Sequence, residues 1–237
     1  LLKPAFLPSA PDSVGDRFEC IISNPPYSIK WKGDADPTLI NDPRFSKAGK
    51  LAPKGKADWA FAEHVLYCLQ EDGCAAIVCF PGIFYRSGAE GQIRKWMAKS
   101  NYVDAVIALP NNLFFGTSIS TCVLVLRKNK KDDAILFLDA KNEFEHEGNK
   151  NKLTDAHMDR ILASLQKRET EPGKSYLASM EEVASHDWSL AVNFYVQKED
   201  NEEPVNIKEL NAKIAQTVSK EEVARKGLNE LIEGLGF

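Results

Sequence analysis

The residues with the clearest chemical potential are Asn24, Pro25, Pro26 and Tyr27, which directly follow the short apolar run "CIIS". Two prolines stop a strand, because each fixes φ and removes a backbone N–H donor. The Asn24 amide oxygen and the Pro25 carbonyl could together accept both N–H bonds of a planar, conjugated amino group, such as N6 of adenine. Holding both bonds pulls that nitrogen toward tetrahedral geometry, and its lone pair then becomes nucleophilic.

Tyr27 adds a flat face to these two acceptors. Stacking a base on an aromatic ring is worth about 1–3 kcal/mol, and a base in a duplex must be flipped out to reach such a pocket. If the activated nitrogen takes a methyl group, no carboxylate base is needed, because the proton leaves after the transfer, when the nitrogen is already cationic. Ligands of open α/β sheets bind beyond the carboxyl ends of strands, which is where the motif lies. A strand terminator with an incidental Asn and Tyr stays open as the alternative.

The segment that follows the motif is basic. Between Ser28 and Lys56 there are seven basic and three acidic residues, in a chain whose net charge is −4. Lys30 and Lys32 lie nearest to the motif. A local basic loop suits contact with phosphates, because phosphate neutralisation is a local event. A solvated lysine-rich loop is the other reading of the same residues.

Apolar patterning predicts an α/β fold. Strands are expected at 17–23 (buried), 74–82 and 103–110, and helices at 56–73 and 87–100. Their alternation indicates a sheet with right-handed crossovers. Two further strands, 121–129 and 134–140, are joined by "KKDD" and predict an antiparallel hairpin. A helix is expected at 153–168 with Thr154 as its N-cap. A last helical segment, 205–237, has a heptad pattern that must pack on its own domain or on a partner.

Composition argues against several other classes of protein. No apolar run reaches the ~18–20 residues of a membrane span, and no signal peptide is evident, so we expect a cytoplasmic protein without a membrane partner. The five cysteines form no C-x-x-C pair and lie in apolar segments, which predicts buried, reduced thiols. The four histidines are scattered, and we expect no metal site.

The sequence resembles a known family. "NPPY" is similar to the catalytic motif of amino-group DNA methyltransferases. In order and spacing, further segments resemble the modification subunit of type I restriction–modification systems. They are "DPRF" (42–45), "KADWAF" (56–61), "AIVCFPGIFYRSGAEGQIRKWM" (76–97), "VIALPNNLFFGTSISTCVLVL" (106–126) and "NKLT" (151–154). The likeness runs from about residue 17 to the C-terminus.

This resemblance implies a Rossmann-like methyltransferase sheet, parallel strands finished by an antiparallel hairpin, followed by a C-terminal helical segment. It implies transfer of a methyl group from S-adenosylmethionine to N6 of adenine in DNA, with Asn24, Pro25, Pro26 and Tyr27 as catalytic residues. Phe114 or Phe115 would form a second wall of the base pocket, hairpin core being the alternative, and Lys30 and Lys32 would contact the DNA. The implied partners are DNA, a specificity subunit, a second modification subunit and a restriction-translocation subunit.

The family binds its cofactor mainly through an acidic, glycine-rich loop, and nothing before Cys20 supplies it. Asn24 is therefore the one cofactor contact expected in this sequence, with the others upstream of Leu1. We expect 1–197 to be the C-terminal part of a catalytic domain, inactive alone, in a longer or split protein, and 198–237 to be an assembly helix. Similar motifs serve RNA and protein-glutamine methyltransferases, and a non-catalytic DNA-binding or scaffold subunit is a further alternative.

Overall fold

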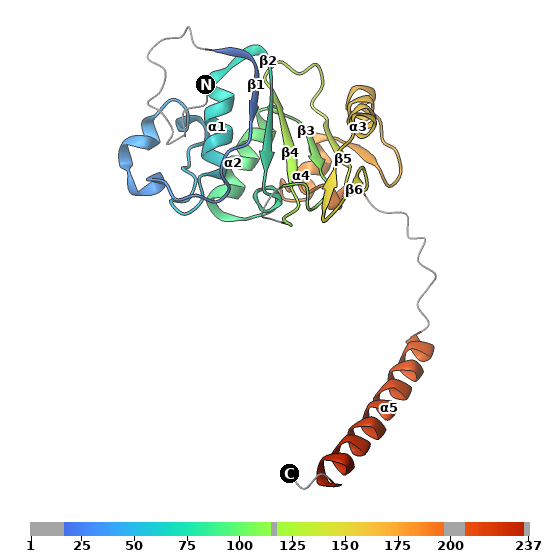
Figure 1. Cartoon of the computed structure of the whole chain (residues 1–237). Coiled ribbons are helices and arrows are strands. Elements are labelled where there is room, and N and C mark those ends of the chain that lie inside the picture. The colour runs from blue at the N-terminus through green and yellow to red at the C-terminus, as the bar shows by residue number, and fades with distance from the viewer. Residues whose placement is uncertain (1–16, 115–117, 197–206, 235–237) are drawn as a thin grey trace. The chain divides into compact units, whose positions relative to one another are not determined.

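The computed structural model describes residues 17–114, 118–196 and 207–234. The chain divides into two compact units, Leu1–Lys198 and Glu199–Phe237. The first unit is built on a six-stranded sheet with the order β1-β2-β4-β3-β5-β8 (Figure 1). The strands are β1 (Phe18–Ser23), β2 (Leu69–Cys79), β3 (Val103–Ala108), β4 (Cys122–Arg127), β5 (Ile135–Asp139) and β8 (Ser175–Ala178).

Strand directions confirm the predicted α/β fold class. β1 and β2 are parallel, as are β3 and β5, whereas β4 is antiparallel to both β2 and β3. β8, which the sequence reading missed, runs antiparallel to β5. The sequence predicted that 121–129 and 134–140 pair as an antiparallel hairpin, and this prediction is wrong. Within the six-stranded sheet, the antiparallel pair of consecutive strands is β3 with β4, and β5 lies on the other side of β3.

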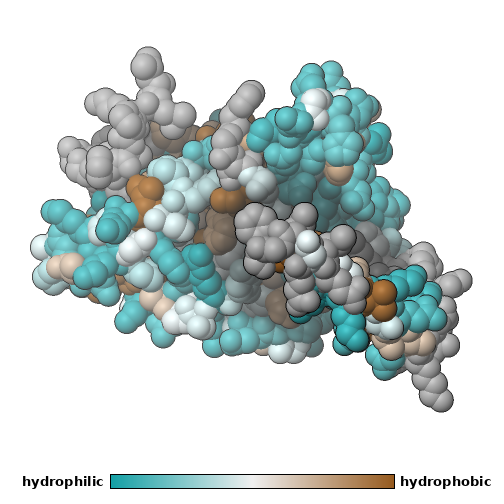
Figure 2. All heavy atoms as spheres, turned by 60° about the horizontal axis from the view of Figure 1, so that its bottom comes forward, coloured by the Kyte–Doolittle hydropathy of each residue, from teal (hydrophilic) through white to brown (hydrophobic). Residues whose placement is uncertain are grey.

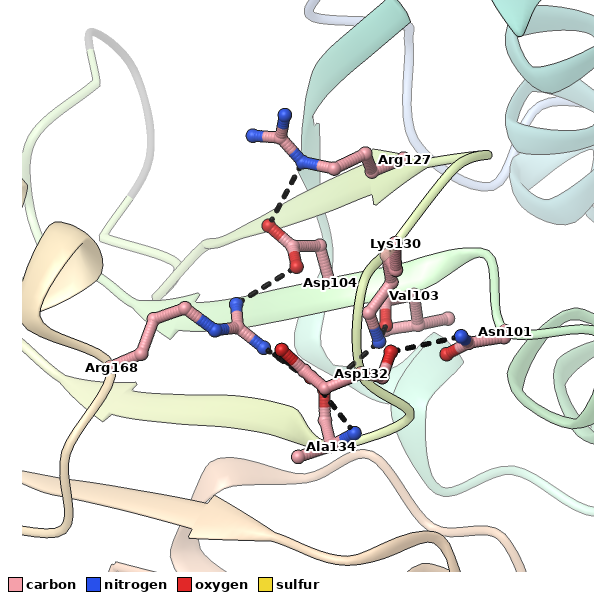
Figure 3. A network of polar contacts seen from close by, with 8 residues as sticks. All are labelled: Asn101, Val103, Asp104, Arg127, Lys130, Asp132, Ala134 and Arg168. Atoms are coloured by element: carbon pink, nitrogen blue, oxygen red, sulfur yellow. Dashed lines mark hydrogen bonds and ion pairs between the residues drawn. The ribbon is translucent and has the colours of Figure 1, made fainter. Parts of the chain in front are cut away.

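A polar network shows why the turn between β4 and β5 does not form a hairpin (Figure 3). Lys130 of that turn donates from Nζ to Val103 O, at the start of β3, at 2.8 Å, and to Ala134 O at 2.9 Å. Arg168 donates to Asp104 Oδ1 at 2.8 Å and also to Ala134 O at 3.0 Å. These bonds hold the turn across the amino end of β3. The chain therefore passes from one side of β3, where β4 lies, to the other side, where β5 begins.

Helices cover both faces of the sheet. α1 (Asp58–Cys68), α2 (Gly88–Lys99) and α4 (Met180–Ser185) pack on one face, where Trp59, Ile93 and Val183 are buried in one core cluster. α3 (Asp155–Lys167) covers the other face, with Ile161 and Leu165 against the second cluster. Thr154 is the N-cap of α3, as predicted. This layering leaves the strand ends free to carry functional loops.

Two sequence predictions fail at β1 and α1. β1 was expected to be buried, but it is an edge strand in which Phe18 is 54% and Ile22 78% exposed, because it pairs with β2 alone among the described strands. Cys20 is likewise exposed, whereas Cys79 and Cys122 are buried, and all five thiols are free. The helix predicted for 56–73 ends at Cys68, because Leu69 pairs with Phe18 and already belongs to β2.

The remaining elements are short, apart from the last helix. Three 3-10 turns lie in the basic loop, η1 (Gly33–Ala35), η2 (Pro37–Asn41) and η3 (Ser46–Ala48), and two more are η4 (Pro81–Phe84) and η5 (Val192–Phe194). A small ribbon pairs β6 (Glu145–Glu147) with β7 (Lys150–Lys152). In the second unit, α5 spans Ile207–Gly234. Among the described residues, no helix is both long and apolar enough to cross a membrane.

Candidate active site

The motif Asn24–Tyr27 lies where β1 ends. Ser23 is the last residue of β1 and pairs with Ile77 of β2, so the motif stands at the carboxyl edge shared by these two parallel strands. The Asn24 side chain is exposed and Tyr27 is half-buried. The Tyr27 hydroxyl donates a hydrogen bond to Asn24 Oδ1 at 3.1 Å. This bond orients the amide and leaves one lone pair of Oδ1 for another donor.

The Pro25 carbonyl is the second predicted acceptor. Neither a backbone nor a side-chain donor of the described residues bonds to it. Pro26 follows and fixes the backbone on its far side. The structure thus brings together two acceptors from adjacent residues, one oriented by Tyr27 and the other by the prolines.

A buried carboxylate holds the turn that follows the motif. Ser28 has a left-handed backbone with φ of 50°, and its N–H donates to Asp58 Oδ1 at 2.9 Å. Asp58 is only 9% exposed and is the first residue of α1. The Ala57 N–H also donates to Ile29 O at 3.1 Å. Sequence reasoning quoted "KADWAF" for the resemblance but assigned Asp58 no role, although an aspartate starting an apolar helix was a usable signal.

Tyr27 is half-buried close to two thiols. Burial raises the pKa of Tyr27, and the nearby thiols of Cys79 and Cys122 act in the same direction. Burial also raises the pKa of Cys122 to about 12, so this thiol stays neutral. Two neutral thiols, at the ends of β2 and β4, therefore lie close to the ring of Tyr27.

Phe114 lies at the same edge of the sheet, in the turn after β3. It is half-buried, and its carbonyl oxygen accepts a hydrogen bond from Lys150 Nζ at 2.7 Å. β2 and β4 stand between β1, which leads into the motif, and β3, which leads into the turn of Phe114. Phe115 lies outside the described residues. The structure thus places Phe114 at the same edge of the sheet as the motif, and its role as a pocket wall stays a prediction.

The basic loop is folded rather than loose. Trp31 donates from its backbone to Lys54 O at 2.9 Å and from Nε1 to Pro53 O at 3.0 Å. A cavity of about 510 Å³ opens beside Trp31, lined also by Lys30, Lys32 and Phe45. Beside it, Arg44 is buried and paired with Asp42 at 2.6 Å, so this cation is unavailable for phosphates.

Lys30 and Lys32 are both exposed beside the motif, as their proposed role requires. Lys32 pairs with Asp36 at 3.5 Å. The exposed lysines of the loop that form no ion pair within the described part of the chain are Lys30, Lys47, Lys50 and Lys54. Figure 2 shows the lower side of the view in Figure 1, where the surface is mostly hydrophilic and apolar side chains form separate patches. This distribution suits a charged, hydrated partner.

Two arginines that could have faced a ligand are structural. Arg94 is buried and donates to Trp188 O, Ile83 O and Arg86 O at 2.6–3.2 Å. Arg86 pairs with Glu90 at 3.4 Å, one turn along α2. No group of three or more His, Cys, Asp or Glu residues that could hold a metal ion occurs among the described residues.

Known proteins match this chain over most of its length. The N-6 DNA Methylase family matches residues 7–204. The type I restriction enzyme MpnII methylase subunit of Mycoplasma pneumoniae is 43% identical over 219 residues, which are 92% of this chain and 40% of that protein. The chain therefore spans less than half the length of this relative.

Solved structures agree. A type I restriction-modification methyltransferase subunit from Streptococcus thermophilus is 44% identical, with a TM-score of 0.76 over 79% of this chain and 40% of that one. A chain from a study of the assembly of the type I restriction-modification system has a TM-score of 0.58 at 16% identity, over 93% of this chain and 46% of its own, which shows a shared fold.

Proposed function

Because the chain belongs to the N-6 DNA Methylase family, we propose that it carries the base-binding part of an enzyme that methylates N6 of adenine in DNA. The observation that supports this most is the pair of acceptors after β1. Asn24 Oδ1, oriented by the Tyr27 hydroxyl at 3.1 Å, stands beside the Pro25 carbonyl, which no described donor occupies.

These acceptors define what the chain would do in the reaction. Asn24 Oδ1 and Pro25 O each accept one N–H bond of the amino group, which localises the nitrogen lone pair. We propose that Tyr27 supports a base flipped out of the duplex, at a cost of a few kcal/mol that stacking offsets. After the N–C bond forms, the nitrogen is cationic, and its excess proton passes to water without a carboxylate base.

The proposed cofactor is S-adenosylmethionine, which would supply the methyl group by cleavage of its bond to the positively charged sulfur, leaving a neutral thioether. The residues at the carboxyl edge of β1 and β2 fit the base rather than this cofactor, because their acceptors and neutral walls match an amino group on a planar ring. Asn24 is the one residue of this chain that we place next to the cofactor. We assign no further step of the reaction to the cofactor site.

The basic loop would bind the DNA backbone. Lys30 and Lys54 are exposed and form no ion pair among the described residues, so their charge is available to phosphates. Lys32 lies next to them. Its ion pair with Asp36 is weak and exposed, so Lys32 would leave Asp36 and bind a phosphate instead. Neutralising phosphates next to the flipped nucleotide would hold the strand in register.

We further propose that the enzyme is a type I modification subunit in the cytoplasm. The similarity to MpnII and to the Streptococcus thermophilus subunit supports this assignment. Its partners would be a specificity subunit, a second modification subunit and a restriction-translocation subunit. α5 presents exposed apolar side chains, such as Leu210 and Ile214 at 48% and 53%, which suit helix packing against the specificity subunit.

The test is Asn24→Ala in the assembled enzyme that contains this chain, with transfer of a radiolabelled methyl group to DNA as the readout. We expect methylation to be lost while the subunits still co-purify. Asn129→Ala is the matched control, because Asn129 is exposed at the opposite edge and makes one bond, to Asp72. An Asn24→Ala enzyme with full activity would contradict the proposal.

The same assay tests the alternative functions. If the unmodified enzyme transfers the label to RNA or to protein glutamine instead of DNA, those substrates are favoured. If Asn24→Ala changes the methylation of no substrate, a scaffold role is favoured.

A further inference from the structure

The ribbon of β6 and β7 lies against the turn that follows β3. The Asn151 N–H donates to Asn112 O at 3.1 Å. The Asn151 side-chain amide donates to Asn111 O at 2.9 Å and to Asn111 Oδ1 at 3.1 Å. Asn151 is only 8% exposed, so these bonds are shielded from water.

Lys150 makes a second set of bonds to the same turn. Its ammonium group donates to Phe114 O at 2.7 Å and to Asn112 Oδ1 at 3.1 Å. In return, Asn112 Nδ2 donates to Asn149 O at 2.6 Å. Carbonyl oxygens of Asn111, Asn112 and Phe114 are thus all held by one strand, some forty residues further along the chain.

The turn needs this support. Asn112 has a left-handed backbone, with φ of 57°, a conformation that asparagine adopts with the help of local hydrogen bonds such as the one it donates to Asn149 O. The ribbon has three residues in each strand, and a two-stranded hairpin of that size is marginal by itself. Turn and ribbon therefore stabilise each other, and moving one displaces the other.

We propose that Lys150 and Asn151 are positioning residues for the base pocket, since they fix the backbone that carries Phe114. This rests on the proposed function and on the role predicted for Phe114 from the sequence, a wall of the base pocket. An aromatic wall acts on a flipped base only if its place is set before the base arrives. Releasing the Phe114 carbonyl frees the backbone to which the ring is attached, whereas the acceptors at Asn24 and Pro25 stay in place.

The test uses Lys150→Met and Asn151→Ala in the assembled enzyme. We expect kcat/KM for DNA methylation to fall about 10- to 100-fold, as small displacements of reacting groups do. DNA affinity should stay within about twofold, because phosphate contacts on the basic loop supply most of it. The fluorescence of 2-aminopurine at the target position should rise less on binding than with the unmodified enzyme. Lys150→Arg should recover part of the activity, because a guanidinium donates to the same two oxygens.

Lys152→Met is the matched control, since Lys152 lies on the same strand, is half exposed and, within the described ranges, forms an ion pair with Glu147 alone, at 3.0 Å. Hydrogen exchange of residues 109–114 gives a readout that does not depend on activity, and it should quicken in Lys150→Met and Asn151→Ala but not in the control. Faster exchange with unchanged kcat/KM and unchanged fluorescence would overturn the positioning role, as would unchanged exchange. An unmodified enzyme that fails to methylate DNA would overturn the proposed function itself.

Discussion

Glu63 tests whether a buried carboxyl group without a hydrogen-bond partner destabilises the folded chain. It lies in α1 and is 1% exposed, and neither of its carboxyl oxygens has a hydrogen-bond partner within the described part of the chain. A buried polar group without a partner costs about 1–3 kcal/mol. Glu63→Met removes the polar atoms with little change in volume or helix propensity. We therefore expect this variant to be more stable than the unmodified chain by about 1–3 kcal/mol.

The effect should depend on pH, because burial holds the pKa of Glu63 well above its ordinary value of 4.5. Below 4.5 the carboxyl is protonated in both folded and unfolded chains. As the pH rises from 4.5 toward the pKa in the folded chain, only the unfolded chain releases this proton, so folding stability falls. Glu63→Gln lacks the charge but keeps two polar atoms. Its advantage should be near zero at pH 4 and grow with pH, whereas that of Glu63→Met should be present throughout.

Urea unfolding followed by tryptophan fluorescence measures both variants and the unmodified chain between pH 4 and 8. Neighbouring His64 titrates too, because burial lowers its pKa to about 4, and this makes all three proteins less stable as the pH falls below 6.5. Comparing the proteins at each pH cancels that contribution. A Glu63→Met chain that is less stable than the unmodified chain at pH 7 would refute the reasoning, because Glu63 would then have a favourable partner.

Other perturbations test the site and its partners. Asp58→Ala should destabilise the chain by about 1.5–3 kcal/mol in urea unfolding, because Ser28 loses a charged acceptor, and Asp58→Asn should cost less; equal losses would contradict this account. Lys30→Met and Lys54→Met should each reduce the slope of log affinity for DNA against log salt by about one, and an unchanged slope would place the phosphates elsewhere. Deleting 204–237 should weaken co-purification with the specificity subunit and leave the melting temperature of the sheet unchanged; normal co-purification would exclude α5 from the interface.

Local chemistry explains what the sequence predicted correctly. Two prolines after an apolar run indicate the end of a strand. Asn24 and Tyr27 flank these prolines and supply a hydrogen-bond acceptor and an aromatic ring, so their position at the strand end was predictable. Thr154 was recognisable as a helix cap for the same reason, since capping depends on residues within one turn. The strand-helix alternation of the first half was also sufficient to predict the fold class.

Long-range pairing explains what was missed. The end of α1 at Cys68 depends on Leu69 pairing with β1, fifty residues earlier, and no local signal reports it. The ribbon that holds Asn112 has no strong strand pattern and forms against a turn nearly forty residues away. The position of β4 between β2 and β3 could not be predicted from the sequence either. Strands that follow one another usually pair, and 134–140 lies nearer to β4 in the sequence than 103–110 does.

The position of β4 also fixes the order in which the sheet can be completed during synthesis. β2 and β3 leave the ribosome before Cys122–Arg127, and in the finished sheet they are two strand spacings apart, about 10 Å. Until β4 arrives, β2 has one unpaired edge and β3 has two, because β5 is made later still, an arrangement prone to wrong pairing or aggregation. The space between β2 and β3 must therefore stay unfilled until β4 is synthesised. We expect folding to be sensitive to the speed at which residues 109–127 are translated.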